Sequence, residues 1–371
     1  MSASRDAMQT VLVIGGGEIT DARLMDALAA HPAYRGIIFG RTIKRDAGSN
    51  RELRDHEVTK AADIATALTG VDMVVNCIAG NPRTILATTK ALCDAARRNP
   101  LRRIVHLSSM TVYGGAEGLV DEETRPEPPL NTYAEARIEC EALVREYVAD
   151  GGDAVIVRPS CVFGPGSEPW ASRIARLLSA RRLGDLGSLG DGVCNLIHVD
   201  DLVALLIAML SASDVSGETF NASADWPRPT WNEFLIRFAR AIGATPVERI
   251  SARRMQVEVK LLAPLLRGAA LVAGRVGAGR LVPDAMTPSF VRLLRQNITV
   301  SGAKASTRIA ITHTPLDRAI DETAQWWKSR HTEAANEPST QPNRAASVSY
   351  THPAATFGSV SRPTPDNEVG R

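Results

Sequence analysis

The sequence predicts an α/β fold, a doubly wound parallel sheet with helices on both faces, followed by a smaller C-terminal lobe. The first observation is the apolar run Val11–Ile14, which stops at three consecutive glycines, Gly15, Gly16 and Gly17, and precedes a helical pattern of apolar residues. The second observation is that strand-like and helix-like segments alternate from there to Val157. Repeated βα units of this length indicate parallel strands joined by right-handed crossovers.

Each element is predicted from the period of its apolar residues, which is two in a strand and about 3.6 in a helix. After 11–14, the sequence predicts strands at 37–39, 73–78, 104–107 and 154–157 and helices at 62–70, 84–98 and 133–148. Beyond Gly166 the alternation is less regular, with helices expected at 171–180, 202–210 and 231–242 and strands at 195–199 and 219–221. We expect this part to cover the carboxyl edge of the sheet, where ligands of open α/β folds bind.

Four segments are expected along the chain. They are an N-terminal extension (1–10), the core of a dinucleotide-binding Rossmann domain (11–166), the remaining Rossmann elements with a substrate-binding lobe (167–330), and a tail (331–371). The tail is expected to be disordered, because its composition changes to Pro, Ser, Thr, Asn and Ala with little apolar content.

Composition limits the classes of function. The net charge of +2 gives no electrostatic case for a nucleic-acid partner. Five dispersed cysteines without a CxxC pair argue against a disulfide framework and against a zinc site, so we expect no metal. The first ten residues are polar and lack the apolar core of a secretory signal, which favours a cytoplasmic protein.

One apolar stretch, Leu261–Val272, needs its own explanation. It contains Pro264 and Arg267 and is too short to span a bilayer, so no membrane span is expected. We expect a buried helix, and contact with a membrane surface is the alternative.

The chemistry centres on Tyr133 and Arg137, which are four residues apart in a helical segment and therefore share a face. A tyrosine ordinarily titrates near pH 10 and acts as an acid or base near neutrality only if its phenolate is stabilised. A cation one turn away supplies that stabilisation. Upstream, the strand in RRIVHLSSMTVYGG delivers Ser108 and Ser109 to its carboxyl end, where a hydroxyl can bond the oxygen that exchanges a proton with the tyrosine.

These segments resemble the extended short-chain dehydrogenase/reductase superfamily, also called the NAD-dependent epimerase/dehydratase family. The segments that match, in order, are VLVIGGGEITDARL, GVDMVVNCIAG, RRIVHLSSMTVYG, NTYAEARIECEALVREY, VIVRPSCVFGPG, NLIHVDDLVALLIAML, GETFNASADWPRPTWNEF and TPLDRAIDETAQWWK. They cover roughly residues 10–328. Eight segments in the same order are far more specific than any single motif.

The resemblance implies roles for particular residues. Ser109 matches the catalytic Ser/Thr, Tyr133 the catalytic tyrosine, and Arg137 the position at which the family has a lysine that binds the nicotinamide ribose. The residues expected to bind the cofactor are Gly15, Gly16, Gly17, Ile19, Arg41, Glu57, Ala79, Gly80, Tyr133, Arg137, Pro159, Cys161 and Val162. Among them, Ala79 and Gly80 match the backbone beside the adenosine half, and the turn from Pro159 to Val162 matches the one that holds the carboxamide.

Two departures from the family pattern matter. In an ungapped alignment, Glu18 and Asp21 replace the second and third glycines of the phosphate turn, which would place carboxylates near the pyrophosphate. A one-residue gap makes Gly17 the second glycine. Arg137 keeps the charge of the family lysine but has a bulkier fork. We expect a turn that still binds the cofactor and a retuned activity, and the alternative is weakened or lost function.

The residues after the second strand bear on the cofactor. NAD selection normally places an acid there, whereas this chain has Phe39-Gly40-Arg41 followed by Lys44 and Arg45. An arginine suits the 2′-phosphate of NADP, so NADP is preferred over NAD, and a solvated basic loop is the alternative. Glu57 matches the family acid that contacts adenine.

The substrate class is narrowed by subfamily residues. Met110-Thr111 stands where 4,6-dehydratases carry an Asp-Glu pair, and Cys161 and Cys194 stand where sugar-nucleotide epimerases tend to have Asn and Arg. The segment TPSFVRLLRQNITVSGAKA instead resembles the 3β-hydroxysteroid dehydrogenase-like branch, which implies an apolar alcohol or ketone. His198 matches a structural turn of the family and is not expected to be catalytic.

The sequence therefore predicts an NAD(P)-dependent oxidoreductase that interconverts a secondary alcohol and a ketone on a small, apolar substrate. Two alternatives remain, an NAD-dependent sugar-nucleotide epimerase and a non-catalytic regulatory or scaffold protein on the same fold. The resemblance also implies a homodimer, because relatives often pair the helices that correspond to 84–98 and 133–148.

Overall fold

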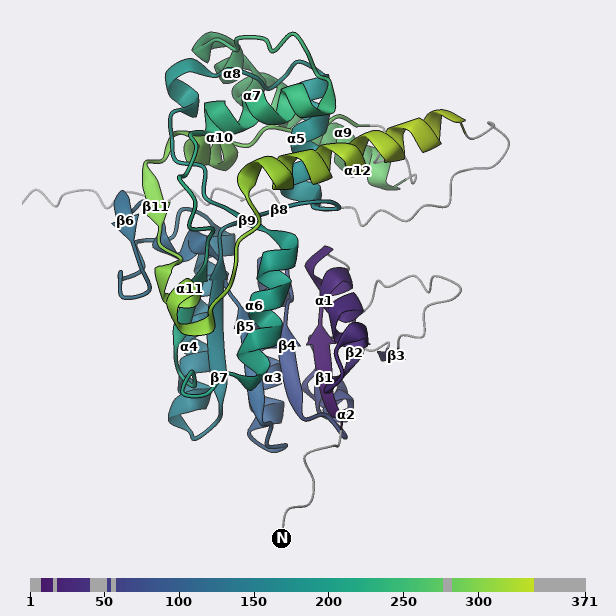
Figure 1. Ribbon diagram of the computed structural model, residues 1–371, viewed down its shortest axis with the longest axis vertical. Helices are drawn as coiled ribbons and strands as arrows, with labels where there is room; N and C mark the ends of the chain where they lie inside the picture. The colour runs from purple at the N-terminus through teal and green to yellow at the C-terminus, as the bar shows by residue number, and fades with distance from the viewer. Residues whose placement is uncertain (1–7, 16–18, 41–51, 55–57, 276–281, 337–371) are drawn as a thin grey trace, which may run out of the picture.

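A seven-stranded parallel sheet forms the centre of the molecule (Figure 1). The computed structural model describes residues 8–15, 19–40, 52–54, 58–275 and 282–336. Along the sheet the strand order is β10-β7-β5-β4-β1-β2-β3. The strands are β1 (Gln9–Ile14), β2 (Tyr34–Phe39), β3 (Glu52–Arg54), β4 (Met73–Asn76), β5 (Arg103–Leu107), β7 (Ala154–Pro159) and β10 (Thr219–Ala222). Because the order reverses between β1 and β4, a ligand crevice is expected at the carboxyl ends of these two strands.

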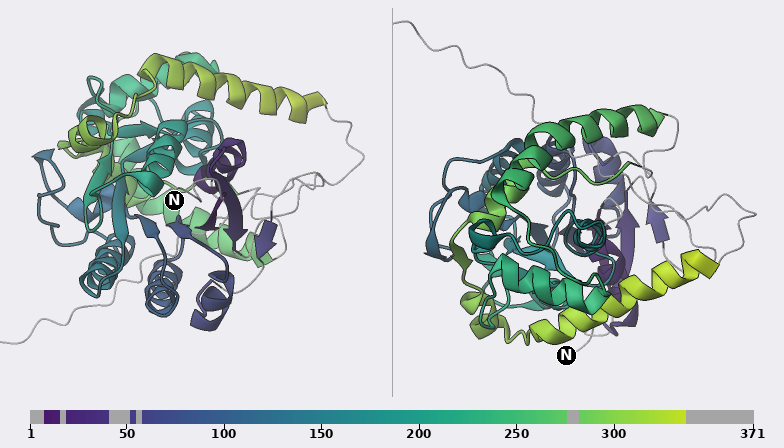
Figure 2. Two further views of the ribbon diagram at one scale, coloured as in Figure 1. Left: turned by 60° about the horizontal axis from the view of Figure 1, so that its bottom comes forward. Right: turned by 90° about the horizontal axis from the view of Figure 1, so that it is seen from above.

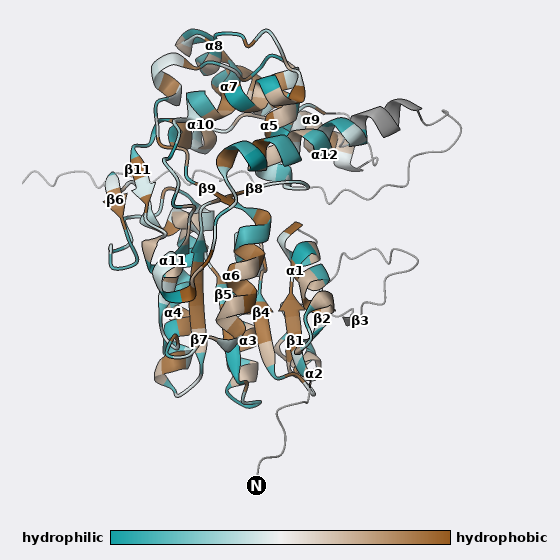
Figure 3. Cartoon of the chain, viewed as in Figure 1, coloured by the Kyte–Doolittle hydropathy of each residue, from teal (hydrophilic) through white to brown (hydrophobic). Residues whose placement is uncertain are grey.

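Both faces of the sheet are buried, which explains why its strands are apolar throughout (Figure 3). Alternate residues of β1 enter different cores: Val11 and Val13 pack on one face, and Leu12 and Ile14 pack on the other. The first face is covered by α1 (Ile19–Ala30) and α6 (Val199–Ser211), which pack against each other. The second face is covered by α2 (Ala61–Ala67), α3 (Pro82–Ala96) and α4 (Thr132–Ala149) (Figure 2).

A second lobe lies over the carboxyl edge of the sheet (Figure 1). It contains α5 (Arg173–Ser179), α7 (Trp231–Ile242), α8 (Ala252–Val257), the π-turn η4 (Glu258–Leu262), α9 (Ala263–Arg275), α10 (Pro288–Arg295) and α12 (Leu316–Asn336). Two small parallel pairs, β8 (Cys161–Phe163) with β9 (Leu196–His198) and β6 (Gly118–Val120) with β11 (Ile298–Val300), connect it to the sheet. Its core is aromatic, with Phe163 edge-on to Phe234 and Phe238. The remaining short helices are η1 (Met110–Tyr113), η2 (Glu168–Ser172), η3 (Gly187–Gly190) and α11 (Ala303–Ile309).

The predicted α/β class and parallel Rossmann sheet are confirmed, and most of the predicted strands and helices differ from expectation only at their ends, whereas short elements such as β3, β6 and β11 were not predicted. The helix α12 continues to Asn336, past His331, where the composition of the chain changes. The imidazole of His198 accepts the backbone N–H of Asp200 at 3.4 Å and so caps the N-terminus of α6. This position fits the structural role expected for it.

One expectation about the lobe is wrong. The stretch Leu261–Val272 was expected to be a buried helix, and it is helical, but Leu261, Leu265, Leu271 and Val272 are all exposed. Apolarity alone does not reveal which side of a lobe a helix occupies. No helix in the described ranges is both long and apolar enough to cross a membrane.

Candidate active site

Backbone hydrogen bonds align the carboxyl ends of the central strands at one edge of the sheet. The amide of Cys77 donates to the carbonyl of Ile14 over 2.8 Å, which joins the ends of β4 and β1. The amide of Ser108 donates to the carbonyl of Val157 over 2.7 Å, which joins the ends of β5 and β7. Side chains that follow these strands therefore gather along one edge of the sheet, as the sequence predicts.

Tyr133 and Arg137 lie on the first turns of α4, whose N-terminus is capped by the Asn131 side chain. The Nε of Arg137 donates to the Tyr133 hydroxyl oxygen over 3.1 Å, and the guanidinium carbon lies 5.1 Å from the centre of the tyrosine ring. Tyr133 is half-buried and Arg137 is buried. The phenol therefore stays accessible to a ligand while its cationic partner is enclosed.

Arg137 is also bound to the ends of two strands. Its Nη1 donates to the carbonyl of Leu107 over 2.7 Å, and its Nη2 donates to the carbonyl of Ile78 over 3.0 Å. Ile78 directly precedes Ala79 and Gly80, both half-buried, and Gly80 adopts a φ of 93°. The structure thus brings Arg137 beside the two residues expected at the adenosine half of the site.

The two serines that follow β5 have different partners. Ser108 is buried and donates its hydroxyl to a carboxylate oxygen of Glu141 over 2.6 Å. Ser109 is half-buried, and its hydroxyl oxygen accepts the backbone N–H of Thr111 at 3.2 Å. Because the Ser109 hydroxyl acts only as an acceptor in this contact, its O–H remains able to donate a hydrogen bond to a ligand. Of the two serines, Ser109 is therefore the one whose hydroxyl proton has no acceptor among the described residues.

A buried polar network behind these residues was not predicted. Glu141 accepts from Arg158 through Nε at 2.9 Å and Nη2 at 2.8 Å, and Arg158 Nη1 donates to the Tyr113 hydroxyl over 3.0 Å. Burial raises the pKa of the Glu141 carboxyl, but the bonds and charge of Arg158 outweigh it and hold this pKa below its usual value. Glu141 follows Tyr133 and Arg137 at four-residue spacing, and this signal could have identified it.

A neutral histidine lies beneath the site, also unpredicted. His106 on β5 is fully buried, and its Nδ1 lies 3.1 Å from the side-chain nitrogen of Asn76. Burial, with a smaller contribution from the charge of Arg137, lowers the pKa of His106 to about 3. The imidazole is therefore uncharged at neutral pH, so Arg137 meets no second cation there.

The described part of the first glycine turn leaves no room for side chains. A Cβ on Gly15 would lie 2.3 Å from a carboxylate oxygen of Asp21, and a Cβ on Gly40 would lie 2.1 Å from the carbonyl oxygen of Gly15. The carboxylate of Asp21 is 1% exposed and packs inside the domain against Gly15. Asp21 is thereby removed from the solvent-accessible surface.

The turn after β7 has an unsatisfied hydroxyl. Pro159 ends β7, the amide of Ser160 donates to the carbonyl of Ala222 over 2.9 Å, and the amide of Cys161 donates to that of Asn195 over 3.1 Å. The buried Ser160 Oγ makes no hydrogen bond within the described residues. A buried hydroxyl in this state is uncommon in folded proteins and leaves this turn with a free donor and acceptor.

Two more predicted residues are close to this turn. Val162 is half-buried, and its carbonyl accepts from the hydroxyl of Ser167 over 2.7 Å. Ile19 packs so closely on Gly166 that a Cβ on that glycine would lie 2.6 Å from its side chain. The start of α1 therefore lies against the loop that follows the turn. By contrast, Cys161 is buried in a way that raises the pKa of its thiol, so it is not a nucleophile.

Some predicted residues lie outside the described ranges. They are Gly16, Gly17, Glu18, Arg41, Lys44, Arg45 and Glu57. Within those ranges, no group of three His, Cys, Asp or Glu side chains is placed to hold a metal ion.

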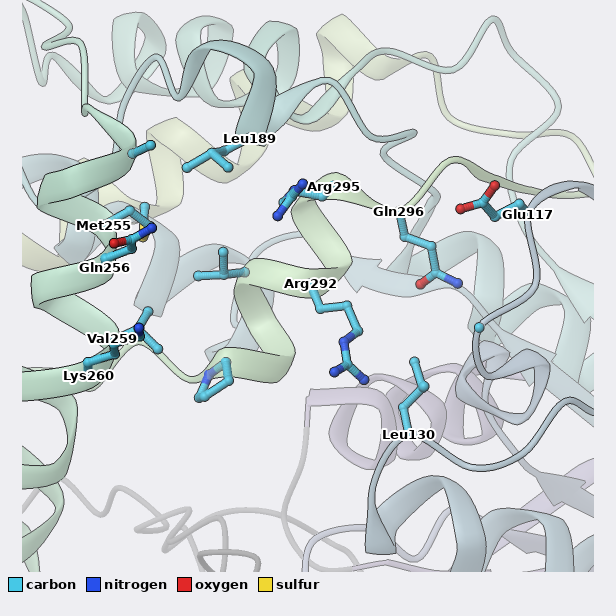
Figure 4. A pocket seen from close by; sticks show the side chains of 14 residues that line it. Glu117, Leu130, Leu189, Met255, Gln256, Val259, Lys260, Arg292, Arg295 and Gln296 are labelled. Carbon is cyan, nitrogen blue, oxygen red and sulfur yellow. The ribbon is translucent and has the colours of Figure 1, made fainter.

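A pocket of about 570 Å³ opens between the sheet edge and the lobe (Figure 4). Leu130, three residues before Tyr133, belongs to its wall. The other residues that line it are Gly115, Glu117, Leu189, Ala252, Met255, Gln256, Val259, Lys260, Pro288, Val291, Arg292, Arg295 and Gln296. The wall is mainly apolar, and Arg292 and Arg295 are exposed and form no ion pair with any described residue. Sequence reasoning missed this pocket, because its walls come from four separate segments.

The family model described as "NAD dependent epimerase/dehydratase family" matches residues 11–223, more than half of the chain. Among curated proteins, the 3beta-hydroxysteroid-dehydrogenase/decarboxylase isoform 1 of Arabidopsis thaliana is 27% identical over 274 residues, 68% of this chain and 59% of that protein. Protein YeeZ of Escherichia coli is 29% identical over 161 residues, 43% of this chain and 54% of YeeZ. The matches thus span less than two thirds of these two relatives. A UDP-glucose 4-epimerase of Azospirillum brasilense is 27% identical over 57% of this chain and 71% of its own length.

Solved structures share the fold. The UDP-glucuronic acid 4-epimerase of Bacillus cereus in complex with NAD superposes with a TM-score of 0.65 at 18% identity, over 86% of this chain and 99% of that one. The UDP-glucose 4-epimerase of Thermotoga maritima superposes with a TM-score of 0.67 at 14% identity, over 87% of this chain and all of that one. At these identities the likeness concerns the fold alone.

Proposed function

This chain belongs to the NAD-dependent epimerase/dehydratase family of extended short-chain dehydrogenases/reductases, and from that premise we propose that it is an NAD(P)-dependent oxidoreductase interconverting a secondary alcohol and a ketone. The observation that carries the proposal is the 3.1 Å hydrogen bond from Arg137 to an accessible Tyr133 hydroxyl. A half-buried phenol bonded to an enclosed cation is suited to exchange a proton with a substrate oxygen.

Each residue has a distinct part in this chemistry. Tyr133 gives its proton to the ketone oxygen in the reductive direction and takes it back in the oxidative direction. Arg137 stabilises the phenolate that remains. Its hydrogen bonds to the two backbone carbonyls hold the guanidinium in place while Tyr133 loses its proton. Ser109 orients the same substrate oxygen with its free hydroxyl proton.

The nicotinamide cofactor, when bound, supplies or accepts the hydride. The residues that would hold it are Gly15 and Ile19 at the first turn, Ala79 and Gly80 after β4, and the turn from Pro159 to Val162. The unsatisfied Ser160 hydroxyl supports the last of these positions. We favour NADP over NAD because Arg41 and no acid follows the second strand.

The pocket supports an apolar substrate with a polar or anionic end. Its lining includes the apolar side chains of Leu130, Leu189, Met255, Val259 and Val291, and Arg292 and Arg295, which form no ion pair with a described residue, belong to the same wall. The Arabidopsis relative is named for dehydrogenation of a hydroxysteroid, which agrees with an apolar secondary alcohol.

A sugar-nucleotide epimerase is the second candidate. The relative from Azospirillum brasilense is named a UDP-glucose 4-epimerase and is matched over 71% of its length. Arg292 and Arg295 suit a diphosphate as well as another anion. An epimerase returns its hydride to the same substrate, so it changes no net amount of cofactor.

The deciding experiment has two stages. The purified protein is titrated with NADPH and NADH by calorimetry, and apolar ketones and sugar nucleotides are then tested for turnover. Cofactor oxidation that accompanies ketone reduction supports the proposal. Epimerised sugar nucleotide without net cofactor oxidation contradicts it and supports the alternative.

The homodimer also stays a proposal. The helices α3 and α4, which correspond to 84–98 and 133–148, pack side by side and could form half of a four-helix bundle. Light scattering on the purified protein measures the mass directly.

A further inference from the structure

A continuous helical run on the rim of the lobe carries an exposed apolar face. The elements α8, η4 and α9 follow one another without a break over residues 252–275, called here the rim helix. The rim helix lies along one side of the lobe, and α12 lies along the opposite side (Figure 2). Its inner residues, such as Met255 and Ala263, are buried, so it is anchored to the lobe.

The outer face of the rim helix is apolar. Val257, Leu261, Leu265 and Val272 are separated by four, four and seven residues, so they lie on one side of the helix. Their exposed fractions are 51, 62, 71 and 65%, and the neighbouring Leu271 is 64% exposed. Single exposed leucines are common, but a row of this length marks a surface that contacts something apolar.

A line of positive charge runs beside this apolar face. Arg253, Lys260 and Arg267 are seven residues apart, close to two helical turns, and none forms an ion pair with a described residue. The rim helix contains one acid, Glu258, which is buried and bonded to Arg182. The exposed charge of the rim helix is therefore entirely basic.

We propose that the rim helix docks the protein on the surface of an anionic lipid bilayer. An amphipathic helix with leucine and valine on one side and Lys and Arg beside them lies in the plane of the interface, its apolar side chains below the headgroups. The phosphates of anionic lipids then neutralise Arg253, Lys260 and Arg267. A second copy of this chain is a poorer occupant, because a two-fold contact would bring two basic stripes together.

Docking would also give the pocket access to apolar substrates. The inner side of the rim helix supplies Met255 and Val259 to the pocket wall, and the exposed Lys260 of the basic line also borders the pocket, so the mouth of the pocket would lie beside the bilayer (Figure 4). An alcohol or ketone dissolved in lipid would then reach the site without crossing water. This step rests on the proposed function, whereas lipid binding itself does not.

The test is flotation of the full-length protein with vesicles of phosphatidylcholine alone or mixed with phosphatidylglycerol. We expect strong binding to the anionic vesicles, weak binding to the neutral ones, and release as salt is raised. Loss of each basic side chain near the surface should weaken partitioning roughly fivefold. Absence of binding to anionic vesicles at low salt overturns the proposal.

Two variants and two matched controls assign the binding to the rim helix. Leu261→Glu/Leu265→Glu should reduce binding at least tenfold, whereas Leu119→Glu, at a leucine that is 74% exposed on β6, should not. Arg253→Gln/Arg267→Gln should reduce binding roughly 25-fold, and Arg98→Gln/Arg102→Gln, at exposed arginines of the opposite sheet edge, should not. Equal binding by the rim variants and their controls overturns the assignment.

The remaining outcomes separate this proposal from the others. If wild-type protein ignores vesicles and the leucine variant lowers its mass in light scattering, the face joins two copies and the lipid proposal fails. The Tyr133→Phe variant should bind vesicles like the wild type. Vesicle binding without any redox turnover would overturn the proposed function alone, and turnover without vesicle binding would overturn this inference alone.

Discussion

Arg137 donates its Nε–H to the Tyr133 hydroxyl oxygen over 3.1 Å, and its two Nη groups donate to the backbone carbonyls of Leu107 and Ile78. One guanidinium therefore joins α4 to the ends of β5 and β4. A planar fork with three separate nitrogens reaches three partners in fixed directions, which a lysine ammonium does with less geometric control. The arginine at this position thus keeps the positive charge of the family lysine and also connects α4 to the ends of two strands.

Replacing Tyr133 by phenylalanine should remove turnover and leave the cofactor bound. General acid–base catalysis contributes about 10²–10⁴-fold, so turnover should fall by that factor. Steady-state rates and calorimetric titration with NADPH measure the two effects. The control is Tyr147→Phe, at a buried tyrosine in the last turn of the same helix, at the opposite end from Tyr133. A Tyr133→Phe variant that turns over like the wild type would contradict the proposed mechanism.

Two substitutions of Arg137 should separate the effect of its positive charge from the effect of its hydrogen bonds to the two backbone carbonyls. Arg137→Met leaves two buried carbonyls without a donor and should lower the free energy of unfolding by about 2–5 kcal/mol, with turnover lost. Arg137→Lys keeps the charge and should recover turnover to within about tenfold of the wild type, because acid–base support is retained. Denaturant unfolding and steady-state rates provide the measurements. Equal turnover in the two variants would show that the charge is not needed.

The two serines after β5 should respond in opposite ways. Ser109→Ala should reduce turnover by about 10–100-fold and change stability little, because it removes an orienting hydroxyl from a partly exposed turn. Ser108→Ala should destabilise by about 1–3 kcal/mol, since the buried Glu141 carboxylate loses a hydrogen bond of 2.6 Å. Thermal melts and rates are measured on both. Reversed effects would exchange the roles assigned to the two residues.

The Glu141–Arg158 pair should behave as a buried ion pair. Removing one partner, as in Arg158→Met, leaves the buried Glu141 carboxylate with the exposed Arg145 as its cationic partner and should cost up to about 3–5 kcal/mol of unfolding free energy. The double variant Arg158→Met/Glu141→Leu should be more stable than Arg158→Met, because the poorly compensated buried charge is gone. Denaturant unfolding of the wild type, the two single variants and the double variant gives the coupling energy. A double variant less stable than both single variants would contradict this account.

Stability should fall with acid because of His106. Its pKa is about 3 in the folded protein because of burial and about 6.5 when unfolded, so between these values only the unfolded chain takes up the proton. Stability is therefore retained above pH 6.5 and should decrease by about 1.5 kcal/mol between pH 6.5 and 5.0. The lowered pKa of Glu141 acts in the same direction only below about 4.5. Unfolding of His106→Gln should show a flatter pH dependence in this interval, and an unchanged slope would assign the effect elsewhere.

Elements with complete local signals were predicted best. The helix Trp231–Ile242 was predicted with its observed ends, because Thr230 and Glu233 form a capping box and Gly243 ends it in a left-handed conformation. The sheet was predicted because its strands are buried on both faces and read as apolar runs. The predicted start of α3 is two residues late although Asn81 and Pro82 mark it, and the strand that begins at Met73 ends two residues earlier than predicted.

The candidate site was predicted in part. Tyr133 and Arg137 share one helix, so their contact follows from spacing alone. The bond from Arg158 to Glu141 and the pocket beside Arg292 join segments far apart in the chain, and no local period reports them. The exposure of the rim helix was missed for the same reason, because both of its sides are apolar.

Local patterns of residues were sufficient to specify the class of fold, the parallel sheet with its glycine turn, and the helix on which Tyr133 and Arg137 meet. These features depend on the period of apolar residues and on spacing within one element, both of which are local. The packed structure adds three facts that no local pattern carries: Ser108 donates to Glu141 whereas Ser109 does not, Asp21 is buried against Gly15, and the rim helix faces outward. Each depends on which distant segments exclude water from a side chain, and that is a property of the packed molecule.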